Sequence, residues 1–259
     1  MLIKLKNTIR NLLKKTYITR LLFAHSSDRR FQKIRFISAT RLSESDFWKK
    51  SALGQSFKPW RNDPDVSYQF YYENTRGLPE LYNVEISRSD DTNVLVFLHD
   101  DVWLNDRDLL PKLRLALKRF DAIGVAGNRR RVPNQPAWAF THVEEEKFIW
   151  DDAENLSGMV QHGKPGQQKG PGYGKCPAHC ELVDGVFIAI RKDVVKTSGV
   201  SFDERFSFDF YDMDFCRSLR LAGLSLGTWP ITLIHESGGA FNSPKWRSAF
   251  QRYIEKWQK

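Results

Sequence analysis

Residues 93–98 (NVLVFL) form an almost unbroken apolar run in the first half of the chain. A run without polar alternation is typical of a strand that is covered on both faces, and such strands lie inside α/β sheets. Around it the sequence predicts strands at 33–38, 66–72 and 122–126, and helices at 43–56, 80–87 and from Asn105 or Asp106 to about Phe120. This alternation predicts an α/β domain with a largely parallel sheet.

The second half continues the pattern less regularly. Strand-like segments at 182–190 and 225–234 flank a predicted helix at 212–221, and residues 160–180 are rich in glycine and proline. A segment of that length and composition is expected to be a functional lid or a linker, and we predict a lid. Residues 245–259 predict a C-terminal helix whose aromatic stripe docks on the core, on a partner or on a membrane.

The positive charge of the chain is concentrated at its N-terminus. The net charge is +9 over 259 residues, of which residues 1–30 carry +7, so residues 31–259 are nearly neutral. This distribution argues against a nucleic-acid partner. Residues 2–23 predict a basic amphipathic helix, which would lie on an anionic membrane surface, pack on the main domain or serve as a transit peptide.

Other features of the sequence bear on the cellular compartment in which the protein is expected. No apolar stretch of about 18 residues predicts a membrane span, and no signal-peptide core is present. The three cysteines are too few for a disulfide framework. We therefore expect a cytoplasmic protein, with residues 2–23 as a candidate attachment to the inner face of the membrane.

An acidic cluster, His99-Asp100-Asp101, directly follows the 93–98 run. Ligands of open α/β sheets bind beyond the carboxyl ends of the strands, and carboxylates there suit Mg²⁺ or Mn²⁺. The alternative is a helix cap or a solvated turn. The position favours a divalent-cation site that bridges to substrate phosphates.

Two further segments carry candidate chemistry. Asp209, Asp212 and Asp214 stand among aromatic residues at the start of a predicted helix, where they either complement the helix dipole or provide a general base. His235 ends an apolar stretch before a glycine pair, so it is a candidate metal ligand as well as a candidate structural histidine.

In their order and spacing, several segments resemble the family-2 glycosyltransferases. They are 34–41, 77–86, VFLHDDVWL (96–104), ELVDGVFIAIRKDVV (181–195), GVSFDERFSF (199–208), FYDMDFCRSLRLAGL (210–224) and ITLIHESGG (231–239). The resemblance implies one GT-A, Rossmann-like domain at 31–259 with a mixed, mostly parallel sheet behind a leader at 1–30. Residues 31–130 would form the nucleotide-sugar half, and 131–259 the acceptor half with the C-terminal helix.

The resemblance also implies roles for individual residues. Asp101 and His235 match the metal ligands and Asp212 the catalytic base, whereas His99 and Tyr211 replace an Asp and a Glu that the family often has. The remaining matches are donor-side Thr40, Arg41, Glu73, Asn83, His99, Asp100 and Asp101, and acceptor-side Asp184, Gly185 and Tyr211. Trp138 is added to the acceptor side because sugars stack on aromatic rings, although core packing explains it equally well.

The implied reaction moves a sugar, with inversion, from a nucleotide-sugar donor to a hydroxyl of a glycan or lipid-linked acceptor. It would require Mn²⁺ or Mg²⁺ and would serve bacterial surface polysaccharide synthesis. The departures at His99 and Tyr211 leave a second interpretation open, a nucleotide-sugar-binding or scaffold protein of the same fold without catalysis.

Overall fold

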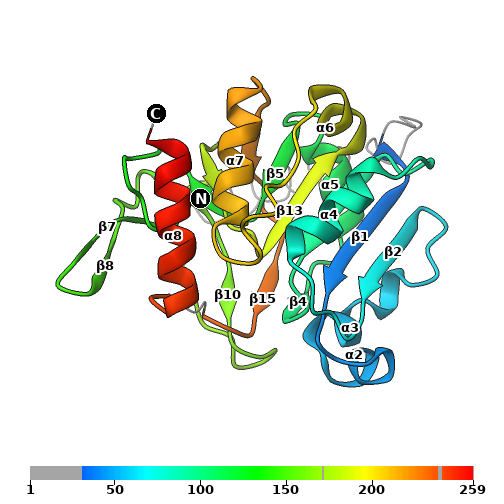
Figure 1. Ribbon diagram of the computed structural model, residues 1–259. Coiled ribbons are helices and arrows are strands. Elements are labelled where there is room, and N and C mark those ends of the chain that lie inside the picture. Colours follow the sequence, from blue (N-terminus) through cyan, green and yellow to red (C-terminus); the bar gives the residue numbers. More distant parts are fainter. Residues whose placement is uncertain (1–30, 171, 239–240, 259) are drawn as a thin grey trace, which may run out of the picture.

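A seven-stranded sheet forms the centre of the computed structural model, which describes residues 31–170, 172–238 and 241–258 (Figure 1). Its strands, in spatial order, are β11 (Ala178–His179), β14 (Leu226–Thr228), β5 (Ala122–Gly124), β13 (Phe187–Arg191), β3 (Val94–Leu98), β1 (Ile34–Ala39) and β2 (Val66–Tyr71). The predicted α/β class and the strand at 93–98 are confirmed, because every residue of β3 is fully buried.

The sheet is mixed, as predicted, but parallel pairings do not dominate it. β1 pairs in parallel with β2 and β3, and β14 pairs in parallel with β5. β13 is antiparallel to both of its neighbours, β3 and β5, and β11 is antiparallel to β14. Three of the six pairings are therefore parallel, since β13 runs against the strands on either side.

Smaller sheets extend the core toward one edge. They are β10 (Gln161–His162), β15 (Leu233–His235) and β4 (Val102–Leu104); β12 (Leu182–Val183), β6 (Ala126–Asn128) and β9 (Leu156–Gly158); and the hairpin of β7 (Phe140–Glu144) and β8 (Lys147–Trp150). The hairpin stands away from the body at the left of Figure 1.

Helices surround the sheets. They are α2 (Glu44–Lys50), α3 (Ala52–Ser56), the 3₁₀ helix η2 (Lys58–Trp60), α4 (Leu78–Ser87), α5 (Leu109–Ala116), α6 (Lys192–Ser198), α7 (Tyr211–Leu221) and α8 (Pro244–Trp257). Among the described residues, no helix is both long and apolar enough to cross a membrane. The predicted leader at 1–30, with its amphipathic helix at 2–23, lies outside the described residues.

Two helices differ from their predicted bounds. The helix expected at 43–56 is divided at Ser51, whose extended backbone ends α2 and whose hydroxyl accepts a hydrogen bond from Gly54 N in α3. Side-chain bonds of this kind let serine compete with helix continuation. The helix expected from Asn105 or Asp106, α5, begins only at Leu109, and the Asp106 carboxylate accepts hydrogen bonds from Lys112 Nζ and Thr232 N.

The C-terminal helix docks on the protein itself. Phe210 stacks on Phe250 and Tyr253 of α8, and Lys256 forms a 2.7 Å ion pair with the buried Asp214 of α7. Trp257 donates from Nε1 to the same carboxylate. Of the three surfaces considered for the aromatic stripe, the core is the one that α8 covers.

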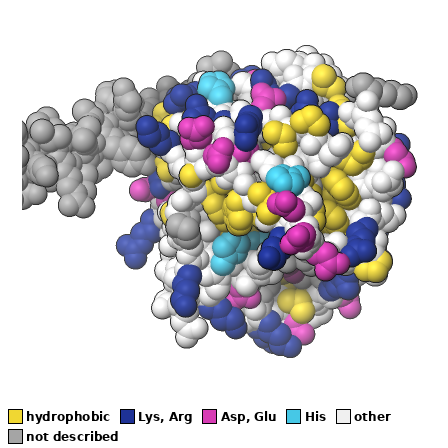
Figure 2. All heavy atoms as spheres, turned by 90° about the vertical axis from the view of Figure 1, so that its left-hand side faces the viewer, with side chains coloured by type: hydrophobic (Ala, Val, Ile, Leu, Met, Phe, Trp, Pro, Cys, Tyr) yellow, Lys and Arg dark blue, Asp and Glu magenta, His cyan; other side chains and the backbone are white. Residues whose placement is uncertain are grey.

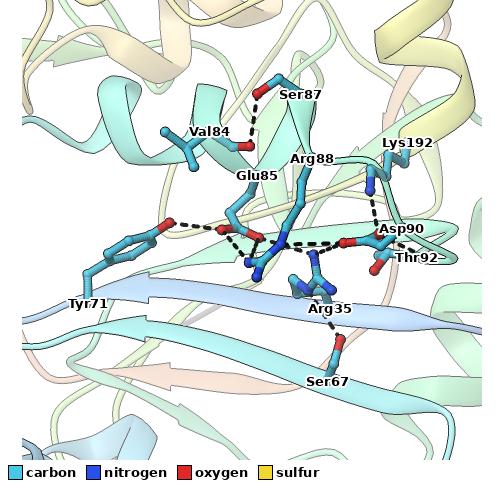
Figure 3. A network of polar contacts seen from close by, with 10 residues as sticks. All are labelled: Arg35, Ser67, Tyr71, Val84, Glu85, Ser87, Arg88, Asp90, Thr92 and Lys192. Atoms are coloured by element: carbon cyan, nitrogen blue, oxygen red, sulfur yellow. Dashed lines mark hydrogen bonds and ion pairs between the residues drawn. The ribbon is translucent and has the colours of Figure 1, made fainter.

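A buried ionic network ties α4 to the central sheet (Figure 3). Glu85 is fully buried and accepts hydrogen bonds from Arg35 of β1, Tyr71 of β2 and Arg88. Arg35 also pairs with Asp90, which in turn accepts from Lys192 of α6. The network therefore connects two strands with two helices.

We expect Glu85→Gln to lower the free energy of unfolding by about 3 kcal/mol, because it removes the buried charge that Arg35, Arg88 and Tyr71 share and leaves the part-buried Arg35 with Asp90 alone. Urea denaturation measures this loss. Glu80→Gln is the matched control, since Glu80 pairs with Arg76 on the exposed side of the same helix and should leave the midpoint unchanged. Equal losses for both variants would contradict the assigned importance of the buried network.

Candidate active site

The site lies beyond the carboxyl ends of the parallel strands β1, β2 and β3. His99, Asp100 and Asp101 follow β3 directly, and Thr40 follows β1. Thr40 N donates to Tyr71 O, which holds the ends of β1 and β2 together. This is the edge at which ligands of open α/β sheets bind.

Sheet pairing brings His235 to the same edge. β15 runs antiparallel to β4, with His235 opposite Val102, and Glu236 N donates to Asp101 O at 3.0 Å. One ligand atom from each of His99, Asp101 and His235 lies within 4.8 Å of the others. Two imidazoles and one carboxylate from distant parts of the chain thus converge.

The electrostatics of this cluster centre on Asp101. Its Oδ1 lies 3.2 Å from His235 Nε2. Burial raises the pKa of Asp101, but the contact with His235 outweighs burial and brings that pKa to about 2. For His235 the directions are opposite: burial alone would lower its pKa, but the contact with Asp101 produces a net rise. The pKa of His99 falls because the ring is buried and lies close to His235.

The cluster fits a divalent cation. Asp101 Oδ1 is buried and has no hydrogen-bond partner of suitable geometry among the described residues. A buried carboxylate oxygen of this kind is costly unless a cation compensates it. The donor set of two nitrogens and one oxygen suits first-row transition ions better than Mg²⁺, which prefers oxygen ligands.

A second group, at the start of α7, contacts the cluster through His99. The Tyr211 hydroxyl lies 3.0 Å from His99 Nε2 and donates to Gly185 O at 2.8 Å. Asp212 accepts from Gly185 N at 2.9 Å. A Cβ at Gly185 would lie 2.5 Å from the Tyr211 hydroxyl oxygen and 2.8 Å from Asp212 Cβ, so this approach requires glycine.

Phe210 determines how α7 enters the site. It caps the helix in a left-handed conformation, with φ of 66°, which is unfavourable for a bulky residue. Its buried ring stacks on Phe250 and Tyr253 of α8, and this packing holds the conformation. The docked C-terminal helix therefore supports the placement of Tyr211 and Asp212.

Asp212 has the electrostatics of a general base. Burial raises its pKa, the negative charge of Asp184 raises it further, and hydrogen bonds from Met213 N and Gly185 N only partly offset these effects. The resulting pKa is about 7. A carboxyl group that titrates near neutral pH is well matched to accepting a proton from a hydroxyl.

Comparison with known proteins identifies the family. A family model described as "Glycosyltransferase like family" matches residues 67–240, which include the His99–Asp101 segment, Asp184, Asp212 and His235. The chain belongs to this glycosyltransferase-like family. The predicted resemblance is confirmed. No curated protein sequence matches the chain significantly.

Solved structures similar to this glycosyltransferase-like chain share little sequence with it. GalNAc-T7 with UDP, GalNAc and Mn²⁺ is 11% identical, with 89% of this chain and 50% of that chain covered and a TM-score of 0.48. S. aureus TarS 1–349 is 11% identical, with 86% and 64% covered and a TM-score of 0.47. The mannosyltransferase PcManGT from Pyrobaculum calidifontis, with GDP-Man and Mn²⁺, is 11% identical, with 92% and 76% covered and a TM-score of 0.42. The chain thus spans half the length of GalNAc-T7 and less than two thirds of TarS.

The predicted donor-side residues of the glycosyltransferase separate into two groups. Thr40, Glu73 and Asp100 lie at adjacent strand ends, where Glu73 N donates to Leu42 O and the Thr40 hydroxyl moderates the rise in the pKa of Asp100 that burial causes. Arg41 is exposed next to Thr40. The amide of Asn83 is instead engaged with Phe202 and Glu204, so the structure does not bring Asn83 to the metal-type cluster.

The predicted acceptor-side residues come from the second half of the chain. The charge of Asp184 acts on the pKa of His235, Asp212 and Tyr173, which places this carboxylate centrally. Trp138 is buried, and its edge meets Tyr173 with ring centroids 5.1 Å apart. Trp150 of β8, 53% exposed, stacks on Tyr173. Figure 2 shows hydrophobic side chains gathered beside histidine and acidic ones on the face toward β7, β8 and α8.

Sequence reasoning missed three side chains at the site. His162 of β10 pairs with His235 across the small sheet, with ring centroids 5.8 Å apart. The Ser237 hydroxyl lies 3.0 Å from His235 Nε2, and the ring of Phe208, 55% exposed, stacks over His99. Strand pairing and ring stacking have no local sequence signal, and His162 stands in the segment at 160–180 that was predicted to be a lid.

Proposed function

We propose that this chain is an inverting, divalent-metal-dependent glycosyltransferase that moves a sugar from a nucleotide-sugar donor to an acceptor hydroxyl. The observation that carries the proposal is the convergence of His99, Asp101 and His235, together with the half-buried Asp212, whose carboxyl has a pKa of about 7. Family membership supports the class of reaction, and the site supplies a metal-type cluster and a base.

In this proposal, His99, Asp101 and His235 hold the divalent cation, and the nitrogen-rich donor set favours Mn²⁺ over Mg²⁺. When bound, the cation would neutralise charge on the diphosphate leaving group as a Lewis acid. Asp101 is ionised at neutral pH because its pKa is about 2, so it offers an anionic ligand throughout the physiological range.

The chain's own residues account for deprotonation of the acceptor. Gly185 N and Met213 N hold the two oxygens of Asp212, which fixes the direction of the carboxylate. Ionised Asp212 takes the proton of the acceptor hydroxyl while the oxygen attacks the anomeric carbon from the face opposite the nucleotide. The C–O bond to the acceptor forms as the bond to the diphosphate breaks, so one displacement inverts the centre.

In this proposal the donor and the acceptor bind to different halves of the chain. Residues 31–130 provide the donor side through Thr40, Arg41, Glu73 and Asp100 at the strand ends, and 131–259 provide the acceptor side. There, the exposed ring of Trp150 beside Tyr173 offers a stacking face for a sugar of a glycan or lipid-linked acceptor. Bacterial surface polysaccharide synthesis is the proposed context, with the enzyme on the cytoplasmic side and residues 2–23 at an anionic membrane surface.

A panel of nucleotide sugars tests the function. The full-length protein is incubated with each donor and either Mn²⁺, Mg²⁺ or EDTA, and thermal stabilisation and donor hydrolysis are measured. We expect at least one donor to stabilise the protein and to be hydrolysed slowly with Mn²⁺, less with Mg²⁺ and not with EDTA. Binding of a donor with no turnover under any condition would favour the non-catalytic scaffold instead.

A further inference from the structure

The hydroxyl group of Tyr211 sits between the metal-type cluster and the loop that holds the proposed base. The side chain is 2% exposed, so it offers no free surface to an acceptor. Its oxygen lies 3.0 Å from His99 Nε2 and 2.8 Å from Gly185 O. Both distances are within hydrogen-bond range.

The donor and acceptor roles in this chain of contacts have one solution. A carbonyl oxygen can only accept, so the single Tyr211 proton is directed at Gly185 O. The Tyr211 oxygen must then accept from His99, which requires the proton of a neutral His99 ring to be on Nε2. The other ring nitrogen, Nδ1, is consequently unprotonated and carries a free lone pair.

We propose that Tyr211 is a positioning residue that holds His99 in the Nε2–H tautomer and thereby presents Nδ1 as a ligand for the divalent cation. The inference rests on the proposed metal dependence and assigns Tyr211 a different role from acceptor contact. Metal-binding histidines commonly have their second nitrogen fixed by such a partner, and loss of the partner lowers metal affinity about 10–100-fold. Here the partner is a phenol, which is itself oriented by a backbone carbonyl.

The tautomer is measured first, on the wild-type protein without metal. In ¹⁵N-histidine-labelled protein, two-dimensional ¹H–¹⁵N spectra distinguish protonated from unprotonated ring nitrogens, and comparison with His99→Ala assigns the His99 signals. We expect a protonated Nε2 and an unprotonated Nδ1. A protonated Nδ1 would overturn the inference without the need for any variant of Tyr211.

Mn²⁺ affinity, measured by titration calorimetry, tests the consequence. Tyr211→Phe should weaken Mn²⁺ binding about 10–100-fold. Tyr253→Phe is the matched control, because Tyr253 is buried and packs on Phe210 beside Tyr211, and its hydroxyl lies near Arg217 and not near the cluster. It should change Mn²⁺ affinity less than about twofold, whereas equal losses in the two variants would mean a packing effect.

A double-mutant cycle separates positioning from general disruption. In the His99→Ala background, Tyr211→Phe should reduce Mn²⁺ affinity little further, because the ligand that Tyr211 positions is already gone. Fully additive losses would overturn the inference. If the wild-type protein binds no Mn²⁺ at all, the proposed function fails; if it binds Mn²⁺ and Tyr211→Phe binds equally well, only the role of Tyr211 fails.

Discussion

Asp212→Asn is expected to reduce glycosyl transfer by about 10³-fold while leaving the affinity for a nucleoside diphosphate unchanged. Asp212 is half-buried and is connected to the metal-type cluster through Gly185 and Tyr211, and its two oxygens are held by backbone N–H groups. An amide cannot take the proton of the acceptor hydroxyl, but it does not alter the three metal-type side chains. Steady-state kinetics together with calorimetry of nucleoside diphosphate binding measure the two effects.

The pH dependence of the wild-type enzyme follows from the same carboxyl. Burial raises the pKa of Asp212 to about 7, so below that pH the group is protonated and cannot act as a base. The rate should therefore rise tenfold per pH unit below about pH 7 and level off above it. Saturating Mn²⁺ at each pH keeps protonation of the histidine ligands from contributing to the profile.

Asp209→Asn provides the matched control, because Asp209 belongs to the same acidic segment and its carboxyl pKa is raised by burial as well. It should keep transfer within a few-fold of wild type and the same pH profile. Transfer by Asp212→Asn at the wild-type rate would assign the base to another group, and a loss of nucleotide binding in that variant would indicate a structural role.

Local patterns were sufficient to predict the elements that carry strong burial signals. The run at 93–98 corresponds to β3, and the aromatic stripe near the C-terminus to α8. Local patterns fail where a single polar contact determines whether a helix continues. The hydrogen bond from Gly54 N to the Ser51 hydroxyl divides the helix that was predicted at 43–56. The hairpin of β7 and β8 was missed because its strands are short and half exposed, so neither shows a clean alternation.

The sequence allowed individual residues of the candidate site to be predicted, but not how they are arranged in space. Asp101, Asp212 and His235 each stand at the end of a recognisable element. The structure brings Asp101 and His235 together, and Asp212 is connected to them through Gly185, Tyr211 and His99. His99 was predicted on the donor side but not as a metal ligand, and it joins Asp101 and His235 because the antiparallel pairing of β15 with β4 brings the second imidazole to it. Pairing between residues more than 130 positions apart leaves no trace in a local sequence window.

Asp101→Asn should weaken Mn²⁺ binding at least about 100-fold and reduce transfer by about 10³-fold, since ligation by an anionic oxygen is worth several kcal/mol of charge stabilisation. Asp101 is the one carboxylate of the cluster, and its buried Oδ1 lies 3.2 Å from His235 Nε2. Calorimetry with Mn²⁺ and kinetics over a range of Mn²⁺ concentrations measure the losses, and high Mn²⁺ should restore part of the rate.

Glu236→Gln makes the same change of acid to amide beside the cluster and is the control for Asp101→Asn. Glu236 accepts a hydrogen bond from Trp103 Nε1, which the glutamine oxygen retains, and it is not one of the three clustered side chains. Its Mn²⁺ affinity should stay within about twofold of wild type. Wild-type Mn²⁺ affinity in Asp101→Asn would mean that the two imidazoles bind the cation without the carboxylate. Equal losses in both variants would mean that the negative charge of this edge, and not ligation by Asp101, attracts the ion.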